Sequence, residues 1–213
     1  MARLPDHLLP AAVGKERISK QAVEQHQRRR VLLASTEVFA RRGYQSTTVD
    51  QIVAAAQIGV GTFYGIFEGK EDCFLRLYDL IVADAEERVA TAVDAEAPWR
   101  DRVVEALTTL LELAAAQPDS ARIVIVEAPR AGRAAEARYA ETVSRLAEGL
   151  REGRSDAAAG GPTASFEHAA VAGLAWTLHQ RLAVGRPLAV RTLLPEMADF
   201  LVAPYAGAGT TKR

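Results

Sequence analysis

The sequence lacks features that several classes of protein require. A single cysteine, Cys73, stands among 213 residues, which excludes an internal disulfide framework and a zinc site built from cysteines, and is typical of a reducing cytoplasm. No apolar run approaches the roughly 18–20 residues of a membrane span, and no apolar signal core stands near the N-terminus. With 49% hydrophobic and 25% charged residues, the composition is that of an ordinary globular protein. We therefore expect a cytoplasmic protein that has no membrane partner.

Residue patterns typical of catalytic and metal sites are also missing. The four histidines form neither an H-x-x-x-H nor an E-x-x-H pair, the spacings that place metal ligands on one face of a helix. No serine stands in the strand-to-helix setting of a nucleophile elbow. We therefore expect no metal, no cofactor and no catalytic residue, although an enzyme built in a helical bundle remains an alternative.

The net charge of −1 hides a basic N-terminal segment. Residues 1–42 contain nine Lys or Arg against four Asp or Glu, a balance of +5, and the remainder of the chain carries a balance of −6. A basic end on an otherwise acidic chain favours a polyanionic partner for that end, although a solvated basic helix face gives the same pattern. Residues 1–17 are expected to form a mobile basic arm.

Helical periodicity runs through nearly the whole chain, and no segment alternates like a half-buried strand, which predicts an all-α protein. Ser19 would cap a first helix that ends at Arg42, where Gly43 fits the left-handed position after the last turn. Thr47, with Asp50 three residues on, would cap a short second helix. Further helices are expected over 70–93, 98–116, 118–130, 134–152, 165–184 and 188–203, with a linker at 154–162 and with Pro195 either kinking the last helix or marking its start.

A glycine-rich stretch beginning at residue 59, GVGTFYGIFEGKED, could be a loop that binds nucleotide phosphates. The dinucleotide fingerprint G-x-G-x-x-G fails, because Tyr64 stands where the third glycine is needed and no strand precedes it. The P-loop pattern also fails, since Gly65 and Gly69 are one residue too close and an acid, Glu71, follows the lysine in place of a hydroxyl residue. The sequence excludes both kinds of nucleotide loop.

The same stretch fits the second helix of a helix-turn-helix. Residues 48–56 would form the first helix, Gln57 and Ile58 the turn, and residues 60–67 the second helix. Each glycine inside a helix costs about 1 kcal/mol relative to alanine, and close approach to DNA would explain why this helix carries two. Phe63 and Phe67, four residues apart, are expected to face the core.

These motifs resemble the DNA-binding domain of the TetR-type transcriptional regulators. The resemblance rests on F-x-x-x-G-Y at 39–44, T-T-V-x-x-I-x-x-x-A at 47–56 and G-T-F-Y-x-x-F-x-x-K-E at 61–71. It implies an all-α fold with an N-terminal three-helix helix-turn-helix DNA-binding head over residues 18–68. A larger C-terminal helical ligand-binding and dimerisation domain would follow over 69–205, then a tail over 206–213. It also implies a homodimer that binds a palindromic operator in double-stranded DNA. By the same resemblance, we expect a repressor that a small-molecule effector releases from that operator.

By position, the resemblance assigns DNA contacts to residues of the head. Phosphate contacts would come from Thr47, Thr48, Thr62, Tyr64 and Lys70, and the residues lying against the groove would be Gly59, Val60, Gly61 and Gly65. The sequence departs from the family pattern at Gln57, where the turn usually has glycine, and at Val60 and Gly65, where many members carry polar or basic residues. We therefore hypothesise that Val60 contacts thymine methyl groups and that DNA shape supplies further readout.

The body offers two sets of candidate residues. A small-molecule pocket could be lined by Trp99, Tyr139, Phe166, Trp176 and His179, although ordinary core packing is the alternative for each. The last two helices have broad apolar stripes and are expected to form a dimeric four-helix bundle through Val171, Leu174, Leu178, Leu193, Met197, Phe200 and Leu201. An architectural DNA-binding protein without an effector remains an alternative. The effector, the operator, the regulated genes and the sign of regulation do not follow from the sequence.

Overall fold

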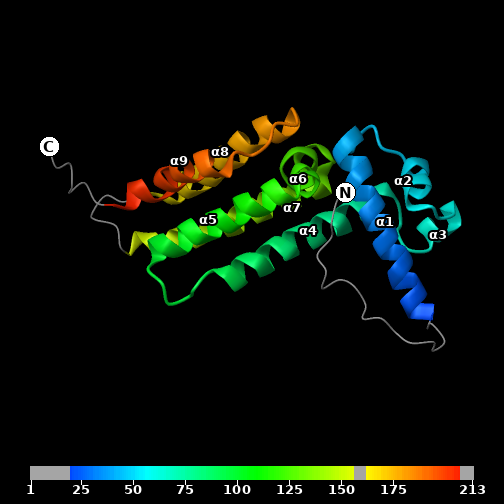
Figure 1. Ribbon diagram of the computed structural model, residues 1–213, viewed down its shortest axis with the longest axis horizontal. Coiled ribbons are helices and arrows are strands. Elements are labelled where there is room, and N and C mark those ends of the chain that lie inside the picture. Colours follow the sequence, from blue (N-terminus) through cyan, green and yellow to red (C-terminus); the bar gives the residue numbers. More distant parts are fainter. Residues whose placement is uncertain (1–19, 156–161, 207–213) are drawn as a thin grey trace.

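The computed structural model describes residues 20–155 and 162–206, and within these ranges the chain is helical and contains no strand (Figure 1). The expectation of an all-α protein is therefore confirmed. The basic arm, the Ser19 cap, most of the predicted linker and all but the first residue of the tail lie outside the described ranges. No helix in the described part of the chain is long and apolar enough to cross a membrane.

The head consists of α1 (Lys20–Arg42), α2 (Val49–Ala56) and α3 (Val60–Tyr64). α1 ends at the predicted residue, and Gly43 follows it in the left-handed region, at a φ of 79°. The cap of α2 differs from the prediction by one residue: Thr48 accepts a hydrogen bond from the backbone N–H of Gln51, whose side chain in turn bonds the N–H of Thr48. α3 is also shorter than the predicted 60–67.

The body begins with α4 (Lys70–Ala92), which runs from the head along the length of the molecule (Figure 1). The other elements are α5 (Trp99–Ala116), α6 (Pro118–Arg122), η2 (Ile123–Glu127), η3 (Ala128–Arg130), α7 (Arg133–Arg151), η4 (Glu152–Arg154), α8 (Ala164–Ala183), α9 (Val190–Val202) and η5 (Ala203–Tyr205). α7 packs on α8 and α5 packs on α9, so that α8 and α9 form an outer layer over α5 and α7. Pro195 lies inside α9, which starts five residues earlier, so Pro195 does not mark the start of the helix.

The segment predicted as one helix over 118–130 changes its winding twice. A short α-helix, α6, passes into a π-helical turn, η2, and then into a 3₁₀ turn, η3. Pro129, in η3, has no N–H to donate and its ring opposes the carbonyl four residues earlier, which disfavours a regular α-helix at this point. The π turn changes which side chains share a face, because its repeat is longer than that of an α-helix.

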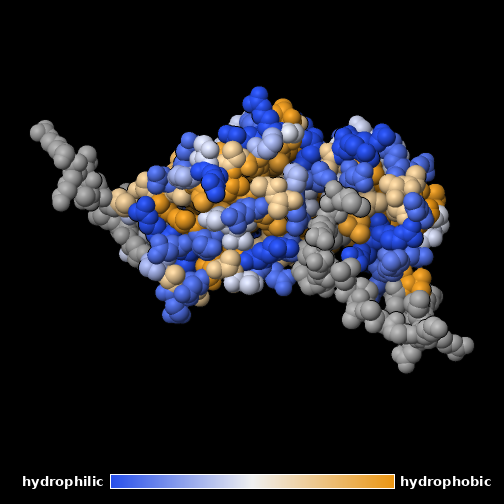
Figure 2. All heavy atoms as spheres, viewed as in Figure 1, coloured by the Kyte–Doolittle hydropathy of each residue, from blue (hydrophilic) through white to orange (hydrophobic). Residues whose placement is uncertain are grey.

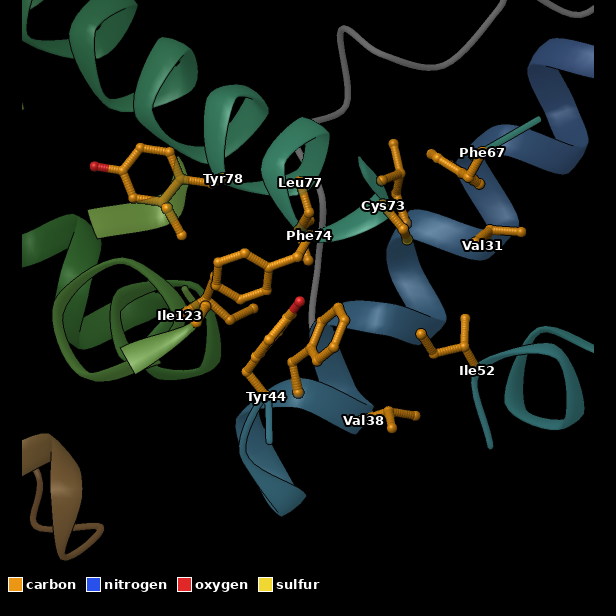
Figure 3. Packing of buried hydrophobic residues seen from close by; sticks show 14 of the residues in the cluster. Val31, Val38, Tyr44, Ile52, Phe67, Cys73, Phe74, Leu77, Tyr78 and Ile123 are labelled. Carbon is orange, nitrogen blue, oxygen red and sulfur yellow. The ribbon is translucent and has the colours of Figure 1, made fainter. Parts of the chain in front are cut away.

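The core of the head extends into the body. Phe74 of α4 meets the rings of Phe39 and Tyr44 at centroid distances of 5.2 and 4.9 Å, in edge-to-face arrangements. Ile123 of η2 belongs to the same buried cluster and is fully buried (Figure 3). A second cluster lies further along the body and joins α5, α8 and α9. The head is therefore packed directly on α4 and η2, and a movement of either element changes its support.

Candidate nucleic-acid interface

The turn between α2 and α3 is held by α1. Gln57 occupies the left-handed region, at φ 54° and ψ 47°, and is the one residue other than glycine with positive φ in the described part of the chain. Its N–H bonds the carbonyl of Ala54 at 3.2 Å. Arg30 of α1 donates from Nη2 to the carbonyl oxygens of Ala56 at 2.7 Å and of Gln57 at 3.2 Å. The orphan carbonyls at the end of α2 are thus satisfied by an arginine, which fixes the turn against α1.

The short helix α3 has one buried and one open face. Phe63 is fully buried, and Phe67, just after the helix, is 1% exposed, as predicted. Val60 and Tyr64 point the other way and are 43% and 56% exposed. Thr62 is half-buried between them. In Figure 1, α3 lies at the end of the molecule furthest from α8 and α9, so its open face is not covered by the body.

The glycines of α3 have no packing role inside the protein. A Cβ at Gly61 would meet no atom within 4 Å, and one at Gly65 would meet only the carbonyl oxygens of Gly61 and Thr62, at 3.4 and 3.5 Å. Gly59 caps the helix in an extended conformation and would meet only the Thr62 hydroxyl at 3.9 Å. Since glycine weakens a helix, its presence at an open position indicates that something outside the chain must come close.

Two of the predicted phosphate contacts are instead internal. Thr47 is 1% exposed, and its hydroxyl donates to the carbonyl of Gly43 at 2.8 Å. Lys70 donates from Nζ to the carbonyls of Tyr44 at 3.0 Å and Thr47 at 2.9 Å, with its ammonium 4.3 Å from the centre of the Tyr44 ring. Burial lowers the pKa of Lys70. Both side chains therefore brace the junction of α1, α2 and α4, because the loop from 43 to 48 folds back on itself.

The other predicted DNA contacts lie at the surface or at its edge. Thr48 is exposed, and because its oxygen accepts from Gln51, its hydroxyl proton remains available to a phosphate oxygen. Tyr64 is the most exposed large hydrophobic residue of the head. Thr48, Thr62 and Tyr64 thus stay predictions for phosphate contacts, and Gly59, Val60, Gly61 and Gly65 stay predictions for the groove.

The residues predicted to line one pocket in the body are scattered. Trp99 is buried, donates from Nε1 to the carbonyl of Gly149 at 3.2 Å and packs on the Tyr205 ring in a tilted arrangement, with the ring centroids 4.5 Å apart. Phe166 packs 6.4 Å from the same Tyr205 ring. The remaining three lie apart from that pair: Tyr139 packs against the core of the head, and Trp176, which is 59% exposed, stacks on His179 at 5.0 Å. The prediction of a shared lining is wrong for this set, because aromatic composition does not say which helix faces meet.

A groove of about 460 Å³ lies instead between α4 and α7. Its lining includes Tyr78, whose hydroxyl donates to Thr142 Oγ1 at 2.9 Å and whose pKa is raised by burial. Ion pairs bridge the two helices along it: Arg138 with Asp79, and Arg145 Nε with Glu86 Oε1 at 3.0 Å. The size is that of a small-molecule site. Sequence spacing could not reveal this groove, since its charged residues are about 60 positions apart and resemble ordinary surface charges.

Three of the residues predicted for dimerisation are used inside the protomer. Leu193, Met197 and Leu201 of α9 are 2%, 4% and 5% exposed and belong to the core that α9 shares with α5. Val171, Leu174 and Leu178 are half-buried against the same core, whereas Phe200 is 49% exposed. The prediction is therefore wrong for the three α9 residues, because the apolar stripe of α9 packs into the core of its own protomer.

The exposed face of α8 carries no charge over most of its length. Its exposed residues between 165 and 180 recur at helical spacing and are Ser165, Ala169, Ala172, Gly173, Trp176, Thr177 and Gln180. Gly173 has no atom within 4 Å of its Cβ position. Figure 2 shows hydrophobic residues reaching the surface along the layer formed by α8 and α9. An uncharged stripe with small residues at its centre permits close helix approach, which is a property of helix–helix interfaces.

One connection between head and body was not predicted. The buried carboxylate of Glu127, in η2, accepts from the backbone N–H of Tyr44 at 2.9 Å and pairs with Arg122 at 3.3 Å. Arg122 also donates to the carbonyls of Leu182 and Ala183, at the end of α8. In the described residues, no group of three or more His, Cys, Asp or Glu side chains could hold a metal ion.

Comparison with known proteins gives matches centred on the head. Residues 31–77 match the sequence model of the family described as bacterial regulatory proteins, tetR family. The chain is 30% identical over 82 residues, 38% of its length, to the HTH-type transcriptional regulator YhgD of Bacillus subtilis (strain 168), of which the match covers 43%. It is 29% identical over 96 residues, 45% of its length, to the HTH-type transcriptional repressor DhaR of Mycobacterium sp. (strain GP1), of which the match covers 46%. The chain thus matches less than half the length of these relatives.

Likeness to solved structures extends over most of the chain. The transcriptional regulator FadR from Bacillus subtilis, in complex with stearoyl-CoA, matches with a TM-score of 0.70 at 20% sequence identity. The match covers 83% of this chain and 98% of that chain. At this level of identity the likeness establishes the fold of head and body together.

Proposed function

We propose that this chain is a ligand-responsive repressor of the tetR family of bacterial regulatory proteins, since residues 31–77, which span its helix-turn-helix, match the sequence model of that family. Two copies bind a palindromic operator, with one α3 in the major groove of each half-site. A small molecule bound in the body releases the operator.

The observation that carries this proposal is the open face of α3. Val60 and Tyr64 are exposed there, while Gly61 has no internal neighbour that would require a glycine. A duplex that approaches this face meets backbone, one isopropyl group and a phenol. The phenolic hydroxyl of Tyr64 suits a phosphate oxygen, and contacts to phosphates position a protein on DNA.

Dimerisation is assigned to the uncharged face of α8. Trp176 supplies a large exposed aromatic surface, and Ala172 and Gly173 let a second helix come close. Aromatic residues are enriched in protein interfaces and charged residues are depleted at their centres, which this stripe matches. Phe200 of α9, also exposed, extends the apolar surface beside it.

The groove between α4 and α7 is the proposed effector site. α4 starts at Lys70, which holds the loop of the head through two carbonyl groups. A ligand that spreads Arg138 from Asp79 moves α4 against α7, and α4 transmits the movement to the head. FadR of Bacillus subtilis, which has a similar fold, was solved in complex with stearoyl-CoA.

The DNA claim is tested by footprinting the region upstream of the chain's own gene at a fixed salt concentration. We expect a protected pseudo-palindrome with the wild type and none with Tyr64→Ala. Tyr139→Ala, a change to a half-buried tyrosine of the body, serves as the control for loss of a tyrosine and should leave the footprint in place. Equal affinity for the protected sequence and for random duplex would overturn the proposal.

The assembly is tested by Ala172→Arg, which places a charge in the middle of the α8 face. Sedimentation should give a dimer for the wild type and a monomer for the variant, with circular dichroism unchanged. Ala140→Arg, at an exposed alanine of α7, should remain dimeric. Dimers in both variants would exclude this face.

Binding of an effector distinguishes the proposed regulator from an architectural DNA-binding protein, which has none. A compound library is screened for a rise in the unfolding midpoint, because a ligand that binds only the folded state stabilises it. Stabilising compounds should weaken operator binding, and Thr142→Trp, which fills the groove, should abolish their effect. If no compound stabilises the protein, the effector-independent function is favoured. Turnover of a bound compound would instead favour an enzyme.

A further inference from the structure

The surface that α3 offers to DNA contains almost no group that can read a base by hydrogen bonding. From residue 58 to residue 67 the sequence is IGVGTFYGIF, without a charged or an amide side chain. Guanine and adenine are recognised in the major groove by paired hydrogen bonds from Arg, Lys, Asn or Gln. Thr62 and Tyr64 are the polar side chains of this segment, and Thr62 is half-buried.

Neighbouring glutamines do not fill this gap. Gln51 uses its carbonyl oxygen to cap the N–H of Thr48, at 3.2 Å. Gln45 donates from Nε2 to the carbonyl of Arg130, at 2.8 Å. Gln57 lies in the turn, where its left-handed backbone is held by Arg30, and precedes α3 by three residues. Apart from the Tyr64 hydroxyl, the open face itself is therefore apolar.

Val60 is the exposed aliphatic side chain of that face, beside Tyr64. The Val60 side chain is 43% exposed, and both its neighbours are glycines: a Cβ at Gly61 would meet no atom within 4 Å, and one at Gly59 only the Thr62 hydroxyl at 3.9 Å. The isopropyl group therefore stands out from bare backbone at the start of a helix whose other face is anchored by Phe63. In the major groove, thymine is the base that presents a methyl group, and apolar side chains recognise it by contact.

We propose that Val60 is the specificity-determining residue of the head and that it selects a thymine 5-methyl group in each half-site of the operator. The proposal rests on the proposed function. The glycines bring the backbone to the groove, and the valine methyl groups exclude water from the thymine methyl. Guanine, which offers acceptors and no methyl group, gains nothing at this position.

The test begins with selection of binding duplexes from a random double-stranded library. Each thymine of the selected duplex is then replaced singly by deoxyuridine, which removes only the 5-methyl group, and the dissociation constant is measured by fluorescence anisotropy at one salt concentration. We expect one symmetry-related pair of thymines whose replacement weakens binding roughly fourfold per half-site, the factor that corresponds to one buried methyl group. 5-Methylcytosine at that position should bind more tightly than cytosine.

The variant Val60→Ala assigns the effect to the side chain. With it, the same deoxyuridine substitutions should change affinity by less than about 1.5-fold, because the contact they remove is already absent. Val23→Ala, at a valine of α1 with the same exposed fraction of 43%, should keep the full dependence on the methyl group.

Three outcomes overturn the inference, and they point to different errors. A selected consensus that tolerates deoxyuridine everywhere, or whose dependence on methyl groups survives in Val60→Ala, removes Val60 as the selecting residue and leaves the proposed function intact. The absence of any consensus removes sequence-specific binding, and the proposed function fails with the inference.

Discussion

The carboxylate of Glu127 accepts a hydrogen bond from the backbone N–H of Tyr44 at 2.9 Å, across 83 positions of sequence. Gly43 leaves room for it, since a Cβ there would approach the carboxylate oxygen to 3.2 Å. The other carboxylate oxygen pairs with Arg122, which also holds the last carbonyls of α8. One buried glutamate thus links the loop of the DNA-binding head to the helix assigned to dimerisation.

Replacing Glu127 with alanine should destabilise the protein by about 2–4 kcal/mol. The change leaves the Tyr44 N–H buried without an acceptor and the Arg122 guanidinium without its counter-ion, and both losses are costly away from water. Urea denaturation at a fixed protein concentration measures the difference in the free energy of unfolding.

Glu141→Ala is the matched control for this prediction. Glu141 also pairs with an arginine, Arg145, but its side chain is 70% exposed, so its removal should cost less than about 0.5 kcal/mol. Glu127→Gln, which keeps an acceptor for Tyr44, should fall between the two. Similar costs for Glu127→Ala and Glu141→Ala would contradict the role assigned to the buried carboxylate.

Gln57→Gly should stabilise the head. A side chain in the left-handed region costs roughly 1 kcal/mol or more, and glycine avoids that cost while giving back part of the gain as entropy of the unfolded chain. We expect a net gain of about 0.5–1 kcal/mol in thermal or urea unfolding. Ala55→Gly, two residues earlier in an exposed position of α2, should have the opposite sign by about 1 kcal/mol. Losses at both positions would show that the Gln57 side chain has a stabilising contact.

Thr47 and Thr48 show what local sequence rules can predict and what they cannot. Both Thr47 and Thr48 are good caps, and the expectation of a short helix after them is correct to within one residue. The choice between them depends on the fold, because Thr47 is buried with its hydroxyl on Gly43 and leaves Thr48 to cap the helix. The left-handed end of α1, by contrast, is favoured by Gly43 itself, whereas the left-handed Gln57 at the end of α2 is held by Arg30.

The sequence did not predict which helices of the body pack against one another. Periodicity predicted nearly every helix, but each amphipathic helix has one apolar stripe, and nothing local says whether that stripe meets its own protomer or a partner. Met197 illustrates the point, since it packs on α5. The Arg122–Glu127 pair was equally hidden, because a spacing of five residues faces together only where the helix widens into the π turn.

Gly61→Ala should raise stability and lower DNA affinity together. A Cβ at position 61 meets no atom in the free protein, so alanine gains about 0.5–1 kcal/mol in helix propensity. On the operator the same methyl group holds the backbone of α3 away from the groove, and binding should weaken about tenfold or more. Thermal unfolding and fluorescence anisotropy on one preparation measure both effects.

Gly149→Ala supplies the control, since this exposed glycine of α7 also has open space at its Cβ position. It should give a similar gain in stability and leave DNA binding unchanged. If Gly61→Ala binds the operator as tightly as the wild type, close approach does not explain the glycine.

The buried thiol of Cys73 should make stability fall at alkaline pH. Its Sγ lies 3.3 Å from the Ser35 hydroxyl, and burial raises its pKa from 9.0 to about 12. Below pH 9 the thiol is protonated in both the folded and the unfolded chain, and its contribution is constant. Between pH 9 and pH 12 the unfolded chain loses the proton while the folded chain retains it, so the free energy of unfolding falls as pH rises, by at most about 1.4 kcal/mol per pH unit.

Cys73→Ala isolates this contribution, because Tyr78 and Tyr205, whose pKa values are also raised by burial, titrate in both proteins. The variant should be less stable at pH 8, and its stability should decline less steeply than that of the wild type between pH 9 and pH 11 in urea denaturation. Parallel declines would mean that the thiol ionises as readily in the folded protein as in the unfolded chain. Alkylation by iodoacetamide at pH 8.5 gives an independent check, since only the thiolate reacts: the folded wild type should be modified many times more slowly than the protein in denaturing urea.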